Sequence, residues 1–238
     1  MSTTKPPLIA SWLGRVEYPA AWSWQRELYL ARLDGDRQDS LMLLEHPHTY
    51  TLGRRADEGD LVYDESQRAA RGIELFHVDR GGRATYHGPG QLVGYPILAL
   101  GERYDVVNYL RALEEVLIRT ARDLGVDAHR DEEHTGVWVG ADKIGAIGVK
   151  ITRGITMHGF AFNVSTDLDM FGGIVPCGIQ GRWVTSVLNE TGSKHELKDV
   201  GEIAANHLAE VFGRRLSWAA PRSMVASDMF VDGVLSAN

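Results

Sequence analysis

The sequence predicts one domain of the α/β class in its α+β form, with a mixed or antiparallel sheet flanked by helices. Three observations predict this fold. Helical periodicity occurs early and late in the chain, short apolar strands cluster in the middle, and no Ser/Gly-rich linker or internal repeat divides the 238 residues. The domain is expected to span residues 8–217, with loosely structured ends at 1–7 and 218–238.

Helices are expected in three long segments and one short one. The first begins near Tyr18-Pro19, because proline is favoured at the first helical position. The second follows Asp105, whose side chain suits an N-cap, and stops at Gly125. The third is expected to open with a capping box of the Asp199-x-x-Glu202 kind. A shorter helix is expected over residues 65–71.

Strands are expected wherever short apolar or alternating runs occur, namely over 40–45, 49–53, 91–98, 136–140, 144–151 and 158–164. The last three follow one another closely, which indicates an antiparallel meander. In the final strand, strict alternation places His158 with Phe160 and Phe162, and Gly159 with Ala161 on the opposite face. The Gly/Ala face suits either a slender apolar ligand or close packing, and periodicity does not separate the two.

Composition limits the classes of function. The formal net charge of -7 argues against general binding to nucleic acid, which needs positive surface. No stretch approaches the ~20 apolar residues of a membrane helix, and the N-terminal segment lacks the apolar core of a signal peptide. Because the chain holds one cysteine, Cys177, it forms no internal disulfide, and a cytoplasmic location is expected.

The densest block of unusual residues runs from Arg80 to Gln91, with the sequence RGGRATYHGPGQ. Its glycines allow the main chain to approach a neighbour closely, and Arg80 and Arg83 supply donors for an anion or a carbonyl-bearing ligand. A hairpin loop rich in turn residues explains the same composition. A phosphate-binding P-loop is excluded, because no Gly-Lys-Ser/Thr follows.

Lys143 and Cys177 each have an ordinary interpretation and a chemical one. A lysine at a strand start is usually a solvated charge, but lysine is also the usual cation that lowers the pKa of a cysteine. A free cysteine usually packs as a small hydrophobe, although Cys177 lies in a glycine-rich turn. His46 and His48 lack a third ligand at suitable spacing, so no metal site is expected.

Taken together, four blocks resemble one family. They are RGGRATYHGPGQLVGYP at 80–96, KIGAIG at 143–148, HGFA at 158–161 and IVPCG at 174–178. In this order they resemble the octanoyltransferases, the lipoyl(octanoyl) transferases of lipoate biosynthesis, over roughly Leu41 to Val187. The resemblance implies the fold of biotin and lipoate protein ligases. It also implies transfer of an octanoyl group from acyl carrier protein to a lysine on lipoyl domains of 2-oxoacid dehydrogenases and on the glycine-cleavage H protein, without a cofactor.

The resemblance also assigns residues by position. Cys177 matches the cysteine that carries the acyl group as a thioester, and Lys143 matches the lysine that lowers its pKa. The matching substrate-contact residues are Arg80, Gly81, Gly82, Arg83, Ala84, Thr85, Tyr86, His87, Ala146, Ile147, Gly148, Gly159, Phe160 and Ala161. If the Gly159 face lines the acyl slot, Gly159→Leu is expected to block octanoyl binding and leave the fold intact.

Partner docking and alternative functions complete these expectations. Acidic partners need local positive surface on this acidic protein, and the candidates are Arg54, Arg55, Arg83, Lys150, Arg153 and Arg182. A monomer is expected. The alternatives are an ATP-dependent lipoate-protein ligase, a non-catalytic protein that binds lipoyl domains, and a cysteine hydrolase with His87 or His158 as its base.

Overall fold

The computed structural model describes residues 5–175, 183–225, 230–231 and 234–235. The helices are α1 Tyr18–Leu33, α2 Glu65–Ala69, α3 Val106–Asp123, α4 Val187–Thr191, α5 Leu197–Val211 and α6 Pro221–Met224, with 3-10 turns at Glu58–Asp60 and Leu168–Gly173. The strands are β1 Pro7–Arg15, β2 Asp39–Glu45, β3 Thr49–Leu52, β4 Glu74–His77, β5 Ala84–His87, β6 Gln91–Ile97, β7 His129–Arg130, β8 Val137–Val139, β9 Asp142–Thr152, β10 Ile155–Asn163, β11 Arg215–Trp218, β12 Phe230–Val231 and β13 Val234–Leu235.

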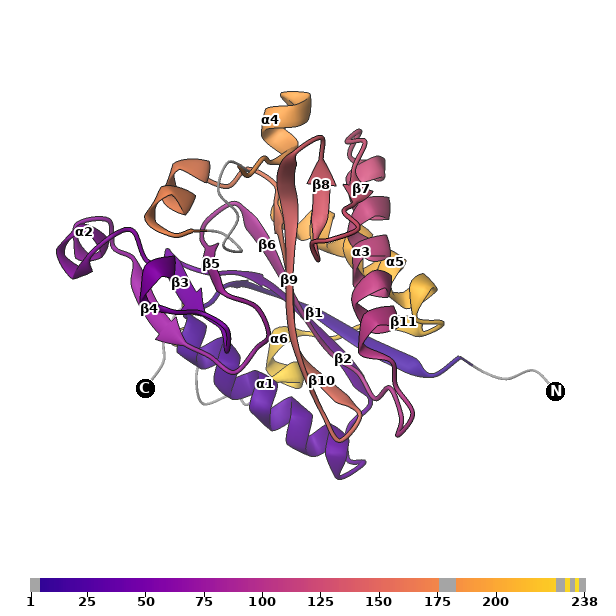
Figure 1. Cartoon of the computed structure of the whole chain (residues 1–238). Helices are drawn as coiled ribbons and strands as arrows, with labels where there is room; N and C mark the ends of the chain where they lie inside the picture. The colour runs from indigo at the N-terminus through magenta and orange to yellow at the C-terminus, as the bar shows by residue number, and fades with distance from the viewer. Residues whose placement is uncertain (1–4, 176–182, 226–229, 232–233, 236–238) are drawn as a thin grey trace.

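An eight-stranded mixed sheet forms the centre of the molecule, in the order β11-β1-β2-β6-β10-β9-β8-β7. Its β1 pairs in parallel with β11 and β2, and the other pairs are antiparallel. Helix α1 lies on one face, and α3 and α5 lie on the other (Figure 1). The predicted mixed sheet flanked by helices is confirmed, as is the meander of β8, β9 and β10.

The sheet separates two apolar layers, because successive side chains of a strand point to opposite faces. In β2, Leu41 and Leu43 pack toward α3 and α5, whereas Met42 and Leu44 pack toward α1. A smaller sheet, β4-β3-β5, adjoins the α1 side of the molecule. There Tyr18, the first residue of α1, stacks on Phe76 of β4 with ring centroids 5.3 Å apart.

Local sequence signals located most helix ends. Helix α1 carries its proline in the first turn, and the Asp105 side chain accepts hydrogen bonds from Val107 N at 2.8 Å and Asn108 N at 3.2 Å, so both predicted starts are confirmed. The capping box predicted at Asp199 is wrong. Helix α5 begins two residues earlier, at Leu197, which packs against the core and places Asp199 inside the first turn.

Several elements carry no clear local signal. Strands β1, β4, β5 and β11 were not predicted, and their partners are distant in sequence; β1, for example, pairs Leu8 with Leu216. The C-terminal segment was expected to be loose from residue 218, but α6 follows at Pro221–Met224, and Met224 and Val225 are buried beside α1. None of the helices in the described ranges is long and apolar enough to cross a membrane.

Candidate active site

A cavity lies on the face of the large sheet that is not covered by α3 and α5, and it encloses about 530 Å³ of empty space including its opening. Its walls come from the 80–87 segment and from β6, β9 and β10, with Tyr18 of α1. The lining residues are Tyr18, Arg80, Ala84, Thr85, His87, Tyr95, Thr135, Lys143, Ala146, Ile147, Gly148, His158, Gly159, Phe160 and Ala161. Residues as far apart in the sequence as Tyr18 and Ala161 therefore converge here.

Most residues assigned by resemblance lie in this cavity, but some do not. Gly82 and Arg83 line a second cavity, which encloses about 790 Å³ of empty space including its opening and which Lys143 also borders. Gly81 lines neither cavity, and its N–H donates to Val149 O at 2.9 Å. Tyr86 is fully buried in the small sheet, where its hydroxyl pairs with His48 Nδ1 at 2.8 Å. Tyr18, Tyr95, Thr135 and His158 are additional lining residues, of which Tyr95 and His158 fall inside recognised blocks.

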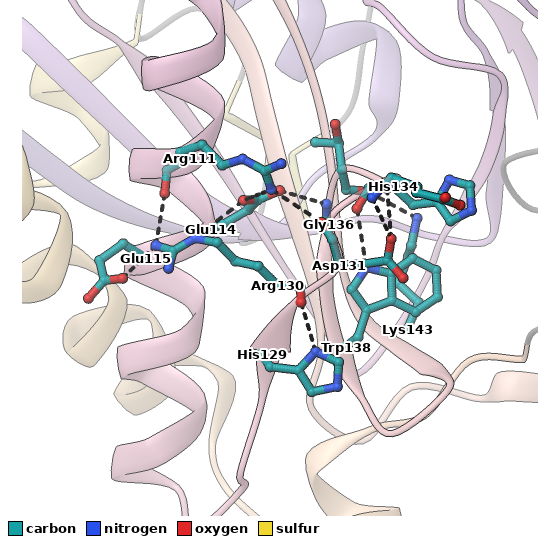
Figure 2. A network of polar contacts seen from close by, with 12 residues as sticks. Arg111, Glu114, Glu115, His129, Arg130, Asp131, His134, Gly136, Trp138 and Lys143 are labelled. Carbon is teal, nitrogen blue, oxygen red and sulfur yellow. Dashed lines mark hydrogen bonds and ion pairs between the residues drawn. The ribbon is translucent and has the colours of Figure 1, made fainter.

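Lys143 is a buried residue of β9, with only 7% of its surface exposed, and not the solvated charge of the ordinary interpretation. Its Nζ donates to Thr135 O at 3.3 Å and lies 4.5 Å from the centroid of the Trp138 ring (Figure 2). Gly136 packs against the same side chain, since a Cβ there would lie 3.2 Å from Lys143 Cε. A carbonyl oxygen and an aromatic face both suit an ammonium group.

Cys177 lies outside the described residues, as does Arg182, but the chain is placed on both sides of them. Val175 N donates to Asp60 O at 2.9 Å, and after the gap Lys143 N donates to Trp183 O at 3.0 Å. Thr185 N returns a hydrogen bond to Lys143 O, also at 3.0 Å. The segment that follows Cys177 in sequence is therefore paired with the backbone of Lys143 itself.

Arg80 explains why the surrounding segments contain glycine. Its guanidinium donates to Thr51 O and Thr51 Oγ1, each at 2.8 Å, and to Gly81 O at 2.9 Å, while the side chain stays 7% exposed. A Cβ at Gly53 would lie 2.7 Å from Arg80 Nη1, and one at Gly148 would lie 2.9 Å from Arg80 Cδ. At Gly53 and Gly148, which lie outside the 80–91 block, the main chain thus approaches the buried arginine of that block.

His87 belongs to a buried polar network. Its Nδ1 lies 2.9 Å from Gln91 Oε1, and Gln91 Nε2 donates to Asn163 Oδ1 at 3.0 Å. Asn163 Nδ2 then donates to Thr185 O at 3.0 Å, which joins the network to the segment beside Lys143. Burial holds the pKa of His87 well below its usual value, so the ring is neutral. Because Gln91 Oε1 can only accept, Nδ1 carries the proton and Nε2 is an acceptor.

His158 departs from the predicted alternation. Its φ of 57° lies in the left-handed region, and its N–H turns to α1, where it donates to Gln25 Oε1 at 2.8 Å. The ring Nε2 lies 2.8 Å from Asp79 Oδ1, and Lys150 Nζ lies 2.6 Å from the other oxygen of Asp79. Burial lowers the pKa of His158 despite the Asp79 hydrogen bond, and that bond is the main cause of the depressed pKa of Asp79.

Gly159 borders the cavity with its backbone, and its missing side chain leaves room for the neighbouring strand. A Cβ there would overlap the carbonyl oxygen of Gly94 in β6 and lie 2.6 Å from Pro96 Cδ. The expectation that Gly159→Leu leaves the fold intact is therefore wrong. Of the two explanations for the Gly/Ala face, close packing holds at Gly159, whereas Ala161 lines the cavity with a side chain 4% exposed.

Comparisons of the sequence agree on one family. A sequence model of the lipoyl protein ligase A/B catalytic domain matches residues 17–209. The chain is 46% identical over 210 residues to an octanoyltransferase of Caldicellulosiruptor bescii, covering 87% of this chain and 92% of that relative. It is 50% identical to an octanoyltransferase of Gloeobacter violaceus, covering 84% and 88%, and 43% identical to one of Mycobacterium sp. (strain KMS), covering 99% and 96%.

Two solved structures with the same fold are ligases. A lipoate-protein ligase A bound with ATP superposes with a TM-score of 0.72 at 17% identity, over 93% of this chain and 91% of that one. The biotin protein ligase of Aquifex aeolicus with biotin and ATP superposes with a TM-score of 0.53 at 15% identity, over 87% and 70%. The expected biotin/lipoate protein ligase-like fold is confirmed. The chain belongs to the lipoyl protein ligase A/B catalytic domain family and, within it, to the octanoyltransferases, which are acyltransferases.

Proposed function

We propose that this octanoyltransferase works in two steps, with the acyl group held on Cys177 between them. The observation that carries the proposal is the burial of Lys143 at the wall of the cavity, with its backbone paired to the segment that follows Cys177. The donor is the octanoyl thioester of acyl carrier protein. The acceptor is a lysine of the lipoyl domains of 2-oxoacid dehydrogenases or of the glycine-cleavage H protein. A reactive thiol suits a reducing compartment, the cytoplasm.

The first step exchanges one thioester for another. The Cys177 thiolate attacks the donor carbonyl, and the new S–C bond forms as the donor S–C bond breaks. The donor sulfur leaves as a thiol with the proton of the Lys143 ammonium, which becomes neutral. The Lys143 ammonium stabilises the thiolate, which otherwise forms only above the usual thiol pKa of about 8.5. Because the bond broken and the bond formed are alike, this step is close to balanced in free energy and needs no ATP.

The second step forms an amide. The neutral amine of the acceptor lysine attacks the Cys177 thioester, the N–C bond forms, and the cysteine leaves as thiolate. The amine loses one proton, which the neutral Lys143 of the acyl-enzyme accepts. The renewed pair of thiolate and ammonium then matches the starting state. Since an amide is more stable than a thioester, this step drives the transfer forward.

The apolar part of the cavity suits the acyl chain. Ala146, Ile147, Phe160 and Ala161 supply apolar wall beside Lys143. Transfer of an eight-carbon tail from water, at about 0.8 kcal/mol for each buried methylene, contributes roughly 5 kcal/mol before ordering is counted. Short side chains at Ala146 and Ala161 leave the space that such a chain needs.

Intact-mass analysis after mixing with octanoyl-acyl carrier protein tests the two-step proposal. We expect one octanoyl adduct on the wild-type chain, none on Cys177→Ser, and loss of the adduct when a lipoyl domain is added. A wild-type chain that transfers octanoate without any adduct would contradict the covalent route. Release of free octanoate in place of transfer would indicate a hydrolase.

The shared fold suggests one competing function. A lipoate-protein ligase A bound with ATP has the same fold at 17% identity, so an ATP-dependent ligase is the second candidate. The two are separated by supplying free octanoate with ATP and a lipoyl domain. We expect no modification under those conditions and full modification with the carrier-bound octanoyl group.

Ion pairs within the protein reduce the number of positive residues that could bind the acidic partners. Arg83 pairs with Asp57 at 2.6 Å and Asp60 at 2.8 Å, and Lys150 pairs with Asp79, so both charges are compensated. Arg54 and Arg55 are exposed, and neither forms an ion pair within the described ranges. Arg55 also lines the second cavity beside Lys143. Arg153 is also exposed, but it lies at the β9–β10 turn and lines neither cavity. We therefore assign partner docking to Arg54 and Arg55 and not to Arg153.

Charge reversal tests this docking surface. Arg54→Glu with Arg55→Glu should raise the Michaelis constant for acyl carrier protein several-fold and flatten its salt dependence, because rim charges mainly steer association. Arg153→Glu is the matched control, since Arg153 is an exposed residue at the β9–β10 turn, ten positions along from Lys143. An equal effect of both changes would contradict a local docking surface.

A further inference from the structure

Glu114 is a carboxylate buried where an apolar residue would be expected. It lies in α3 next to Leu113 and three residues before Leu117, on the side of the helix that packs against the sheet, and it is 0% exposed. Burying a carboxylate is unfavourable unless hydrogen bonds and opposite charges compensate it. Helix packing does not require a charge at this position, so its contacts should explain it.

The contacts of Glu114 reach two arginines and one backbone amide (Figure 2). Oε2 accepts from Arg111 Nη1 at 2.8 Å and lies 3.5 Å from Arg130 Nε. Oε1 accepts from the N–H of Gly136 at 3.0 Å. The arginine side chains are 40% and 38% exposed, so they compensate the charge from the solvent side. Among the described residues, the inward contact of this carboxylate is the one to Gly136.

The Gly136 N–H shares one peptide group with the carbonyl of Thr135. That carbonyl accepts the hydrogen bond from Lys143 Nζ at 3.3 Å. A trans peptide group is planar and rigid, so its N–H and C=O point in opposite directions. A carboxylate on the N–H therefore fixes the direction of the C=O, and it also polarises the carbonyl oxygen toward a better acceptor. Gly136 has a φ of 133°, a conformation that favours glycine, so the peptide orientation needs such an anchor.

We infer that Glu114 is a positioning residue for Lys143, acting through the peptide group between Thr135 and Gly136. The Glu114 carboxylate accepts from the Gly136 N–H, and the Thr135 carbonyl accepts from the Lys143 ammonium. The peptide group between Thr135 and Gly136 thus connects α3 to the cavity. This inference rests on the proposed function, in which Lys143 stabilises the Cys177 thiolate. A purely structural role would predict that Glu114 fastens the 131–136 loop with no specific effect on Lys143.

Two conservative variants separate the effect of side-chain length at position 114 from the effect of its negative charge. Glu114→Asp keeps the charge and the arginine pairs but is one methylene too short to hold the Gly136 N–H. Glu114→Gln loses the charge but keeps an oxygen that can accept from Gly136. The matched control is Glu115→Asp, on the same helix, because among the described residues Glu115 pairs with Arg119 and Arg130 and not with the 131–136 loop.

The readout is the pH dependence of alkylation of the full-length chain by iodoacetamide, which reports one thiol because Cys177 is the single cysteine. We expect Glu114→Asp to move the midpoint up by roughly one pH unit, with about tenfold slower alkylation at neutral pH. Glu114→Gln should stay within about threefold of the wild-type rate, and Glu115→Asp should match the wild type. A Glu114→Asp midpoint equal to that of the wild type would overturn the inference.

A double variant distinguishes positioning from general loosening. In a Lys143→Met background, Glu114→Asp should produce no further shift, since the group that it positions is absent. The same shift in both backgrounds would overturn the inference in favour of a structural role. If Lys143→Met alone leaves the midpoint unchanged, the proposed role of Lys143 fails instead, so the two failures are distinguishable.

Discussion

The two faces of the large sheet are built in different ways. The face under α3 and α5 is filled by fully buried side chains such as Leu117, Phe162 and Leu208. The face toward the small sheet holds a cavity lined by buried polar groups, among them Arg80, His87 and Tyr95. Apolar packing alone would close this space, whereas groups tied into hydrogen-bond networks keep fixed positions around it. The first face stabilises the fold, and the second keeps a site open.

The largest expected effect lies on the packed face. Phe162→Ala should lower the free energy of unfolding by about 3–5 kcal/mol, because Phe162 is fully buried and its removal leaves a cavity. Denaturant titration measures the change. Leu30→Ala is the control at a side chain 54% exposed, where a change within about 0.5 kcal/mol is expected. Equal losses at the two positions would contradict the comparison.

The second effect comes from the buried histidines of the cavity side. His46 donates from Nδ1 to Val16 O at 2.6 Å and accepts at Nε2 from the Tyr95 hydroxyl at 2.8 Å. Burial lowers its pKa to about 4 in the folded chain, against about 6.5 when unfolded. Between these values the unfolded state binds the additional proton, so stability falls as pH falls from about 6.5 to 4.

For His46 alone the acid loss approaches about 3 kcal/mol. Thermal unfolding from pH 7 to pH 4 measures it, and His46→Gln should reduce the slope in this window. His129→Gln, at an exposed histidine, should leave the slope unchanged. A flat stability profile for the wild type would show that burial does not hold His46 neutral.

The third prediction concerns a residue that borders the cavity but should behave like the packed face. Gly159→Ala should destabilise the fold by about 1–3 kcal/mol, because the added Cβ meets the Gly94 backbone and strands β6 and β10 must separate. The change is measured by denaturant titration. Gly35→Ala is a control for a glycine with no atom near its Cβ, where only the backbone conformation opposes alanine. If Gly159→Ala left the stability unaltered, Gly159 would border open cavity space and would not be closely packed against β6.

The smallest effect in free energy should appear in substrate choice. Ala146→Leu adds a branched side chain at a half-buried cavity position and should slow octanoyl transfer by about tenfold, while butanoyl transfer changes less. The ratio of kcat/KM for the two donors measures this selectivity. Val107→Leu, at a side chain 61% exposed on α3, is the control. An equal loss with both chain lengths would show that Ala146 does not contact the distal chain.

Local signals predicted α1, α3 and the central strands, because caps, proline and periodicity act over a few residues. Strands β1 and β11 escaped prediction, since their pairing joins the two ends of the domain. The four sequence blocks that resemble the octanoyltransferases predicted most residues of the cavity. The positions of these residues depend on contacts between distant segments, such as the one between Arg80 and Thr51, which local patterns do not reveal. The sequence shows Glu114 as a charged residue on the buried face of a predicted helix. Its proposed role follows only from the structure, which places the Gly136 N–H against its carboxylate.

The arrangement around Arg80 has a consequence for how this sequence can vary. Gly53, Gly82 and Gly148 come from three separate segments, and each leaves space for the same side chain. At Gly148 a Cβ would lie 2.9 Å from Arg80 Cδ, so a larger residue there requires a shorter residue 80, whereas shortening Arg80 alone removes a donor from the Thr51 carbonyl. At Gly53 a Cβ would also lie 2.5 Å from Gly82 O, and Gly82 has a φ of 90°, so a shorter residue 80 does not free these two positions. A library that aims to reshape this wall should therefore vary residues 80 and 148 together and keep glycine at 53 and 82.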